Sequence, residues 1–246
     1  MPNIRLRLEY DGTLFRGWQV QPGERTVQGA LEDALRRITG DWVRVTAAGR
    51  TDTGVHALDQ VVNFKYDGAA TPAELARSIN GVLPRDVAVW AADVVPDAFN
   101  ARFDARKRAY EYRISTRRRA VGSGFCWWVR VPLRVDAMNH AGSALLGRRD
   151  FTSFCVAAGE RESRVCEVSA CAWSAGSEPG LLVLTIEADR FVRAMVRGIV
   201  GTLVDIGRGR LPEAAIADIL ASEDRRCAGA TAPARGLFLK RVDYEV

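Results

Sequence analysis

The sequence is poor in histidine and has no paired cysteines. Of its 246 residues two are histidines, His56 and His140, and five are cysteines, none of which stands in a CxxC pair. Zinc sites need several such ligands at short spacing, so the sequence predicts no metal site. The odd number of scattered cysteines also argues against a disulfide framework and favours free thiols in a reducing compartment.

Long hydrophobic runs are also missing. The first eight residues, MPNIRLRL, contain no apolar signal core. The most apolar long segment, residues 191–206, is interrupted by Arg193, Arg197 and Asp205, which excludes a membrane span. We therefore expect no membrane partner and a cytoplasmic location.

Basic residues are in excess and are clustered. Lys and Arg exceed Asp and Glu by 35 − 30 = 5, a balance that suits a polyanionic partner. The distribution is more informative than the total, because the basic residues gather at three places: Arg102, Arg106, Lys107 and Arg108; Arg117, Arg118 and Arg119; Arg190, Arg193 and Arg197.

Hydrophobic periodicity predicts the same order of elements twice. Strands are expected at 4–10, 43–47, 61–66 and 86–95, with helices at 27–38 and 72–83; the second set has strands at 110–115, 165–173, 181–188 and 237–244, with helices at 136–146, 190–206 and 212–221. Strand-helix-strand-strand-helix-strand is the ferredoxin-like βαββαβ arrangement, so we predict an α+β fold of two such halves, residues 1–105 and 106–246, with helices on one face of a mainly antiparallel sheet. That fold serves many functions and decides none.

Residues 49–56, GRTDTGVH, lie between two predicted strands of the first half. Loops held by flanking strands often present functional carboxylates, and Asp52 is placed in this way. Asp-Thr-Gly is also ordinary turn chemistry, because it combines a side-chain acceptor with a permissive glycine. On spacing alone the plain turn is the better interpretation.

The predicted helix at 190–206 is apolar over most of its circumference. On a helical wheel Arg190, Arg193 and Arg197 line up on the remaining strip. Such a helix is largely buried, so its arginines must meet water, a carboxylate or a phosphate.

Five motifs in order give the sequence a family resemblance. They are YDGTLFRGWQ at 10–19, GRTDTGVH at 49–56, RAYEY at 108–112, FVRAMVRGIVG at 191–201 and TAPARGL at 231–237. Each is weak alone, but together they span the chain and resemble the tRNA pseudouridine synthase A family. The resemblance outweighs the plain-turn interpretation of residues 49–56.

The resemblance implies an enzyme that isomerises uridine to pseudouridine at positions 38–40 of the tRNA anticodon stem-loop. It implies no cofactor and no metal, a homodimer, and two halves that share one extended sheet. Asp52 is then the catalytic aspartate, Tyr110 contacts the target base, and Arg50 and Arg197 serve the active site. The departures, Thr53 in place of a more usual alanine and Cys227 in an otherwise typical segment, remove no group that the chemistry needs.

The chemistry gives these residue types a purpose. An ionised carboxylate can attack the ribose carbon or the base ring and split one hard step into two. A cation such as Arg197 would keep the carboxylate charged in a site sealed from water. Tyr110 could stack on an extruded base or take its proton, and Arg50 could fill the gap left by the base or bind a phosphate. Arg190 and Arg193 meet phosphates or water, and Arg117–Arg119 face RNA or solvent.

Two other functions compete with this one. A non-catalytic RNA-binding protein of the same fold would need arginines and aromatics but no aspartate held between glycines. A glycoside hydrolase-like enzyme would need two carboxylates at a defined separation, and no second acid is marked by a comparable motif.

Overall fold

The computed structural model of the chain describes residues 1–156 and 163–244. It combines five α-helices with mainly antiparallel strands, which confirms the predicted α+β class. Its contacts divide it into two compact units, Met1–Arg106 with Phe238–Val246 and Lys107–Leu237. The division into halves 1–105 and 106–246 stays a prediction. Within the described residues, each helix is too short or too polar to cross a membrane.

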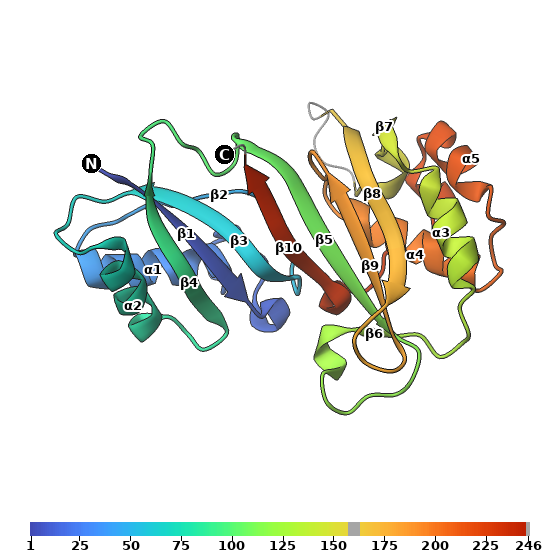
Figure 1. Cartoon of the computed structure of the whole chain (residues 1–246), viewed down its shortest axis with the longest axis horizontal. Coiled ribbons are helices and arrows are strands. Elements are labelled where there is room, and N and C mark those ends of the chain that lie inside the picture. Colours follow the sequence, from blue (N-terminus) through green and yellow to red (C-terminus); the bar gives the residue numbers. More distant parts are fainter. Residues whose placement is uncertain (157–162, 245–246) are drawn as a thin grey trace. The chain divides into compact units, whose positions relative to one another are not determined.

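The first unit contains five strands and two helices (Figure 1). Its elements are β1 (Asn3–Tyr10), α1 (Val27–Thr39), β2 (Thr46–Ala47), β3 (His56–Lys65), α2 (Pro72–Val82), β4 (Val87–Val95) and β10 (Leu237–Tyr244). The order across the sheet is β4-β1-β3-β10, and β2 also pairs with β3. The strands β1, β2 and β4 pair antiparallel with their neighbours, as a ferredoxin-like half requires.

The two helices of this unit begin at the predicted residues and end within one residue of the predicted positions. Thr26 accepts a hydrogen bond from the Gly29 N–H at the start of α1, and Gly40 ends that helix in the left-handed conformation. At the start of α2, Thr71 and Glu74 form a capping box ahead of Pro72. These local bonds satisfy backbone groups that a helix end would otherwise leave without partners.

Strand β3 begins at His56, five residues before the predicted start at residue 61. The prediction failed because Asp59 and Gln60 look like loop residues, although both are buried. Arg7 of β1 compensates for the buried acid by donating from two nitrogens to the Asp59 carboxylate. This bond raises the pKa of Arg7, against the lowering effect of burial. The first residues of β3, which follow the GRTDTGVH segment, are therefore held rigidly in the sheet.

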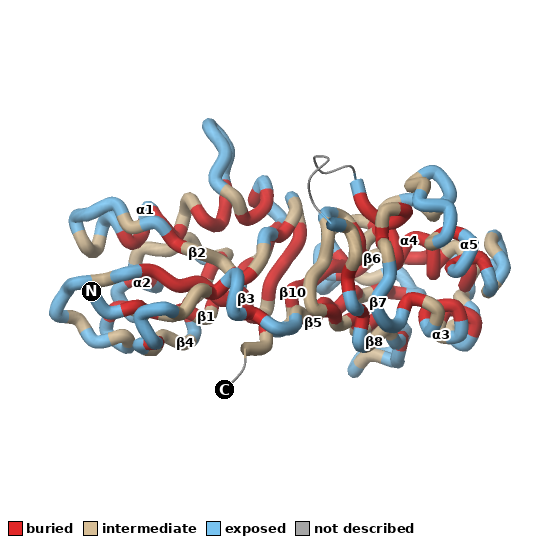
Figure 2. The backbone as a smooth tube through the Cα atoms, turned by 90° about the horizontal axis from the view of Figure 1, so that it is seen from above, coloured by how far each residue is buried: buried red, intermediate tan, exposed pale blue. Residues whose placement is uncertain are grey.

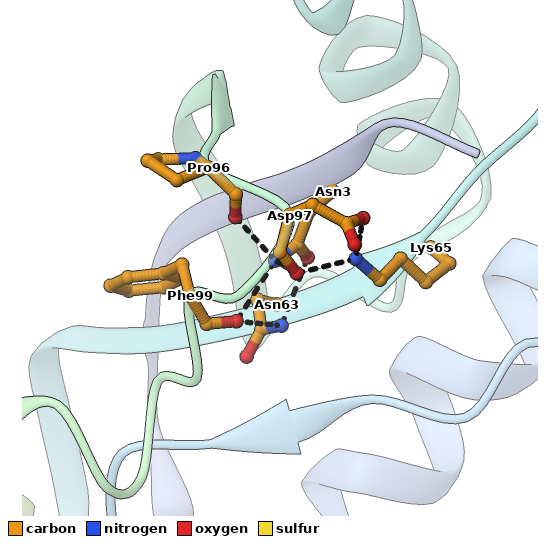
Figure 3. A network of polar contacts seen from close by, with 6 residues as sticks. All are labelled: Asn3, Asn63, Lys65, Pro96, Asp97 and Phe99. Carbon is orange, nitrogen blue, oxygen red and sulfur yellow. Dashed lines mark hydrogen bonds and ion pairs between the residues drawn. The ribbon is translucent and has the colours of Figure 1, made fainter.

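A polar network fixes the segment after β4 to the edge of β1 and β3 (Figure 3). The Asn3 amide donates to the carbonyls of Pro96 and Phe99 at 3.1 and 2.9 Å. The Asn63 amide donates to Asn3 at 2.9 Å, and Lys65 pairs with Asp97. Buried amides need such partners, so the network fixes the path of the chain as it leaves β4.

The second unit contains the remaining strands and helices. They are β5 (Ala105–Ser115), β6 (Trp127–Trp128), α3 (Val135–Ser143), β7 (Gly147–Asp150), β8 (Val165–Ala175), β9 (Leu181–Ala188), α4 (Met195–Gly207) and α5 (Ala215–Ser222). The strand order is β5-β9-β8-β7, with β6 on β5. The short strands β6 and β7 were not predicted, because two to four residues carry no usable periodicity.

Helix α4 begins at Met195, and the predicted start at residue 190 is wrong. Asp189 accepts from the N–H groups of Arg190 and Glu167, and Ala194 takes the left-handed φ of 62°, so the chain turns before the helix starts. The arginine stripe is therefore wrong as well, since Arg197 alone of its three members is helical. The helix itself is buried along most of its length (Figure 2), as the apolar pattern predicts.

Glycines let the backbone approach α4 closely. A Cβ atom at Gly201 would lie 1.7 Å from the Ala230 carbonyl oxygen, and one at Gly198 would lie 2.6 Å from that of Phe154. The Thr202 hydroxyl accepts from the Gly229 N–H at 2.9 Å, on the same side of the helix. The loop before β10 is therefore packed directly on the helix backbone.

Substitution of Gly201 tests this packing. Gly201→Ala should lower the free energy of unfolding by about 2–4 kcal/mol, because the added methyl group overlaps a backbone oxygen. Gly81→Ala in α2 is the matched control: its Cβ meets nothing within 4 Å, so better helix propensity should stabilise the protein by up to about 1 kcal/mol. Urea unfolding measures both, and equal effects of the two substitutions would contradict the packing described.

Candidate functional site

The loop that carries Asp52 connects the antiparallel strands β2 and β3. At its start the Ala48 N–H donates to the Val61 carbonyl at 2.8 Å, and the Gln60 amide donates to the Gly49 carbonyl at 2.9 Å. Its end is a turn in which the Asp52 carbonyl accepts from the Val55 N–H at 3.1 Å. Gly54 has φ +74° at the third position of that turn, the conformation that a type II turn requires.

The first motif, residues 10–19, packs directly on this loop. The Trp18 N–H donates to the Thr51 carbonyl at 3.0 Å, and the Gly54 N–H donates to the Phe15 carbonyl at 3.3 Å. A Cβ at Gly17 would lie 2.7 Å from the Thr51 carbonyl oxygen, so this contact admits no side chain. Phe15 and Trp18, unusually apolar for a loop, are almost completely buried. The two motifs thus form one structural unit around Asp52.

A buried side-chain bond joins β1 to the same loop. The hydroxyls of Tyr10 and Thr51 lie 2.7 Å apart, and the Gln60 amide donates to the Tyr10 oxygen at 3.5 Å. Burial raises the pKa of Tyr10 to about 12, against the lowering effect of these two bonds. The Tyr10 hydroxyl therefore stays protonated and fixes the residue that precedes Asp52.

His56 is a structural residue of β3. Its Nδ1 accepts from the Gly12 N–H at 3.0 Å, and its ring stacks on Phe238 with centroids 4.6 Å apart. The Asp11 carboxylate lies 3.1 Å from the same nitrogen. Burial raises the pKa of Asp11, but hydrogen bonds from the hydroxyl and the N–H of Thr13 lower it, and the pKa lies below its usual value. These contacts anchor the far end of the Asp52 loop.

The candidate residues of the first unit differ in exposure. The side chain of Asp52 is half-buried, whereas Arg50, two residues earlier, is exposed. Across residues 1–156 and 163–244 no hydrogen bond or ion pair engages the Arg50 guanidinium. A fixed carboxylate and an available cation thus stand on one loop.

The candidate residues of the second unit lie on β5 and at the start of α4. Tyr110 on β5 is 9% exposed, and Phe191 meets its ring edge-on with centroids 5.1 Å apart. Arg108, on the same strand, donates to the Asp189 carbonyl at 2.8 Å. The turn that precedes α4 is therefore packed against the strand that carries Tyr110.

Arg197 is joined to the last motif, residues 231–237. Its Nε donates to the Ala232 carbonyl at 2.7 Å, and the Ala232 N–H donates to the Arg197 carbonyl at 3.0 Å. The Tyr112 hydroxyl donates to the neighbouring Pro233 carbonyl at 2.8 Å, and burial raises the pKa of Tyr112. The three motifs of the second unit thus come together around Arg197.

Each unit gathers its own motifs: Asp52 and Arg50 belong to the first, Tyr110 and Arg197 to the second. Sequence reasoning missed Arg225, which donates to the carbonyls of Ala228 and Gly229 and to the Thr231 hydroxyl and so holds the loop beside α4. A single arginine in a loop gives no sequence signal for such a role. No three His, Cys, Asp or Glu side chains gather as metal ligands within the described part of the chain.

Known proteins resemble this chain over nearly its whole length. A family model described as tRNA pseudouridine synthase matches residues 8–104 and 141–245. The chain belongs to the tRNA pseudouridine synthase family. Proteins named tRNA pseudouridine synthase A are similar to it in Halalkalibacterium halodurans (44% identical, covering 98% of this chain and 92% of that protein), Methylobacillus flagellatus (43%, 98% and 93%) and Myxococcus xanthus (41%, 99% and 92%).

Membership in this family confirms the resemblance predicted from the five motifs. The protein is an enzyme, an isomerase that acts on uridine in tRNA. This overturns the two competing interpretations, the non-catalytic RNA-binding protein and the glycoside hydrolase-like enzyme. The doubled pattern of elements and the excess of basic residues agree with a synthase of this family.

The buried Tyr10 hydroxyl predicts a dependence of stability on pH. With a pKa of about 12 folded and about 10 unfolded, its contribution is complete below pH 10 and is lost as pH rises to 12. The loss amounts to roughly 3 kcal/mol at most. Tyr10→Phe should therefore lose less stability than the wild type between pH 10 and 12 in urea unfolding.

At pH 8 the same variant should be less stable by about 1–3 kcal/mol, because the Thr51 hydroxyl loses its buried partner. Tyr66→Phe, at the end of β3 where the tyrosine is half-buried, serves as the control and should follow the wild-type pH profile. Parallel profiles for Tyr10→Phe and the wild type would contradict the assigned role.

Proposed function

We propose that this enzyme converts uridine to pseudouridine at positions 38–40 of the tRNA anticodon stem-loop, with Asp52 as the nucleophile. The observation that carries the proposal is the fixed placement of the Asp52 carboxylate. It stands half-buried on a turn whose backbone is held by hydrogen bonds from Trp18, Val55 and Gly54 and by the Tyr10 hydroxyl. The target positions rest on the resemblance of the five motifs to the family.

The reaction explains why the carboxylate must be held so firmly. Isomerisation breaks the N-glycosidic bond, turns the uracil and rejoins it to the ribose through carbon. A carboxylate that attacks the sugar or the base holds one fragment covalently while the other turns. A nucleophile fixed within reach of the reacting carbon gains much of its rate from orientation, and a loop tied down at both ends supplies that.

Tyr110 is the proposed contact of the target base. A uridine inside a stem must leave the stack before it can react, at a cost of a few kcal/mol. A tyrosine ring can stack on the extruded base and return about 1–3 kcal/mol. The edge-on contact with Phe191 holds the Tyr110 ring in one orientation. Whether its hydroxyl also removes the proton from the base carbon stays open.

The two arginines have separate proposed roles. Arg197 stabilises the negative charge of the Asp52 carboxylate and of the transition state. Its Nε bond to Ala232 fixes the guanidinium, so it needs no reorientation during the reaction. Arg50, exposed and uncommitted within the described residues, fills the gap left by the base or binds a neighbouring phosphate.

The remaining parts of the proposal come from the resemblance and, for the location, from the sequence composition. The enzyme works as a homodimer in the cytoplasm, and its chemistry uses neither cofactor nor metal. Arg190 and Arg193 lie before α4, and their proposed role is to contact phosphates of the RNA rather than the reacting nucleotide.

Substitution of Asp52 tests the nucleophile. Asp52→Asn keeps the shape of the side chain and removes its charge, so pseudouridine formation should fall at least roughly 10⁴-fold. The dissociation constant for unmodified tRNA should change by less than about threefold, because binding depends on the arginines. Chemical mapping of the product and filter binding measure the two quantities.

The matched control is Asp33→Asn, an exposed acid on α1, which should leave both quantities unchanged. A wild-type enzyme that forms no pseudouridine in the anticodon stem, or an Asp52→Asn enzyme that still forms it, would overturn the proposal. Product at other tRNA positions alone would overturn the assignment to 38–40 while leaving the family membership intact.

Substitution of Arg197 tests the electrostatic role. Arg197→Met should lower kcat about 10²- to 10³-fold while tRNA affinity changes little, because the lost charge acts in the transition state. Arg210→Met, at an exposed residue three positions after the end of α4, controls for the loss of a positive charge near the same helix. Equal, salt-dependent losses of kcat/KM and affinity in Arg197→Met would instead make Arg197 a phosphate contact.

A further inference from the structure

A cavity of about 260 Å³ lies in the second unit, at the end of strand β5. Its lining includes Ser115, Arg119, Cys126, Trp128 and Arg235. These residues come from β5, from the loop that follows it, from β6 and from the 3₁₀ turn η5 (Ala234–Gly236). None of them is among the proposed catalytic or base-contacting residues.

Positive charge is in excess around the cavity. Arg235 donates from Nε to the Cys126 carbonyl at 3.2 Å, and within the described residues its two terminal nitrogens have no acceptor. Arg119, whose side chain is 11% exposed, pairs through Nη2 with Glu178. Its buried Nη1 has no acceptor among the residues that the structure describes. Two guanidinium groups therefore face one carboxylate, and donors are left over.

The effects on the pKa of the Cys126 thiol also indicate an excess of positive charge around the cavity. Burial raises its pKa, while the charges of Arg119, Arg235 and Arg113 lower it and that of Glu178 raises it. Three nearby cations thus act against one anion. The exposed Arg235 is able to reach a ligand. The more enclosed Arg119 adds to the positive electrostatic potential inside the cavity.

The donor geometry selects the class of ligand. The free edge of the Arg235 guanidinium offers two parallel N–H groups, which match the oxygens of a phosphate. The Ser115 hydroxyl donates to the Arg117 carbonyl at 2.7 Å and so holds the loop that carries Arg119. Trp128 adds an aromatic surface, with the Arg130 guanidinium 4.6 Å from its ring centre. A phosphate joined to a planar base has this combination of charge and ring.

We propose that this cavity binds a phosphodiester group of the RNA substrate, away from the reacting nucleotide. The inference rests on the proposed function, because it takes Tyr110 as the contact of the target base. Ser115 follows Tyr110 by five residues on β5, a separation of about 17 Å at 3.3–3.4 Å per residue. The cavity therefore contributes to tRNA affinity and leaves the chemical step alone.

The salt dependence of tRNA binding tests this. With wild-type enzyme and Arg235→Met, the dissociation constant is measured from 50 to 300 mM KCl, together with kcat at saturating tRNA. Loss of one phosphate contact should raise the dissociation constant about three- to tenfold near 100 mM salt and make the log–log slope shallower by about 0.7–0.9. The value of kcat should stay within about twofold, and Arg235→Lys should recover most of the slope.

The matched control is Arg226→Met. Arg226 is exposed, but Asp224 already neutralises it through hydrogen bonds of 2.9 and 2.6 Å, so its removal should leave the slope unchanged. A slope for Arg235→Met equal to that of the control, or a loss of kcat at unchanged affinity, overturns the proposal.

A second arm separates RNA from a free anion. Inorganic phosphate is titrated calorimetrically into wild type and Arg235→Met. Phosphate binding that Arg235→Met abolishes, with no change in the salt slope for tRNA, would assign the cavity to a small anion and overturn the RNA assignment. Because the slope needs no product, it remains informative even if no pseudouridine forms at positions 38–40.

Discussion

The contact between the backbones of two loops is the constraint on which the first unit depends. The Asp52 loop contains almost no regular structure, so its shape comes from the segment of residues 12–18 beneath it. Gly17 permits that segment to reach the Thr51 carbonyl, and hydrogen bonds from Trp18 and to Phe15 fix the distance. The buried Tyr10 hydroxyl adds a side-chain bond from β1. The position of this carboxylate is therefore set by the backbone that carries it.

In the second unit a helix, α4, fixes the position of the candidate residue Arg197. Because Gly198 and Gly201 carry no side chain, two loops can lie directly on α4. The Gly229 N–H also donates to the Thr202 hydroxyl. Arg197 then exchanges two hydrogen bonds with Ala232, so the guanidinium and the loop hold each other in place. In both units a glycine close to a carbonyl oxygen sets the geometry, and a polar side chain secures it.

The regular elements of the fold were largely predictable, because capping residues and hydrophobic periodicity act locally. Thr26, Gly40 and the Thr71–Glu74 capping box place the first two helices to within a residue. Prediction failed where the local structure depends on a residue that is distant in the sequence or on an unusual backbone conformation. Asp59 looks like a loop residue until Arg7 of another strand pairs with it, and the turn before α4 depends on Asp189 and on the conformation of Ala194. For the site, motifs named Asp52, Arg50, Tyr110 and Arg197, but no pattern indicated Thr51, Arg225 or the cavity at Arg235.

The first unit is assembled from both ends of the chain. Strand β10 pairs with β3 in parallel, placing Phe238 opposite His56, and its remaining residues belong to the same unit. During synthesis the Asp52 loop and His56 therefore leave the ribosome long before Phe238, which stacks on His56, has been made. The early part of the chain must wait, with one edge of β3 uncovered, until the residues of β10 have been made. Contacts of such long sequence separation slow folding and expose strand edges to wrong partners. The support of this loop is thus complete only after β10 has been made.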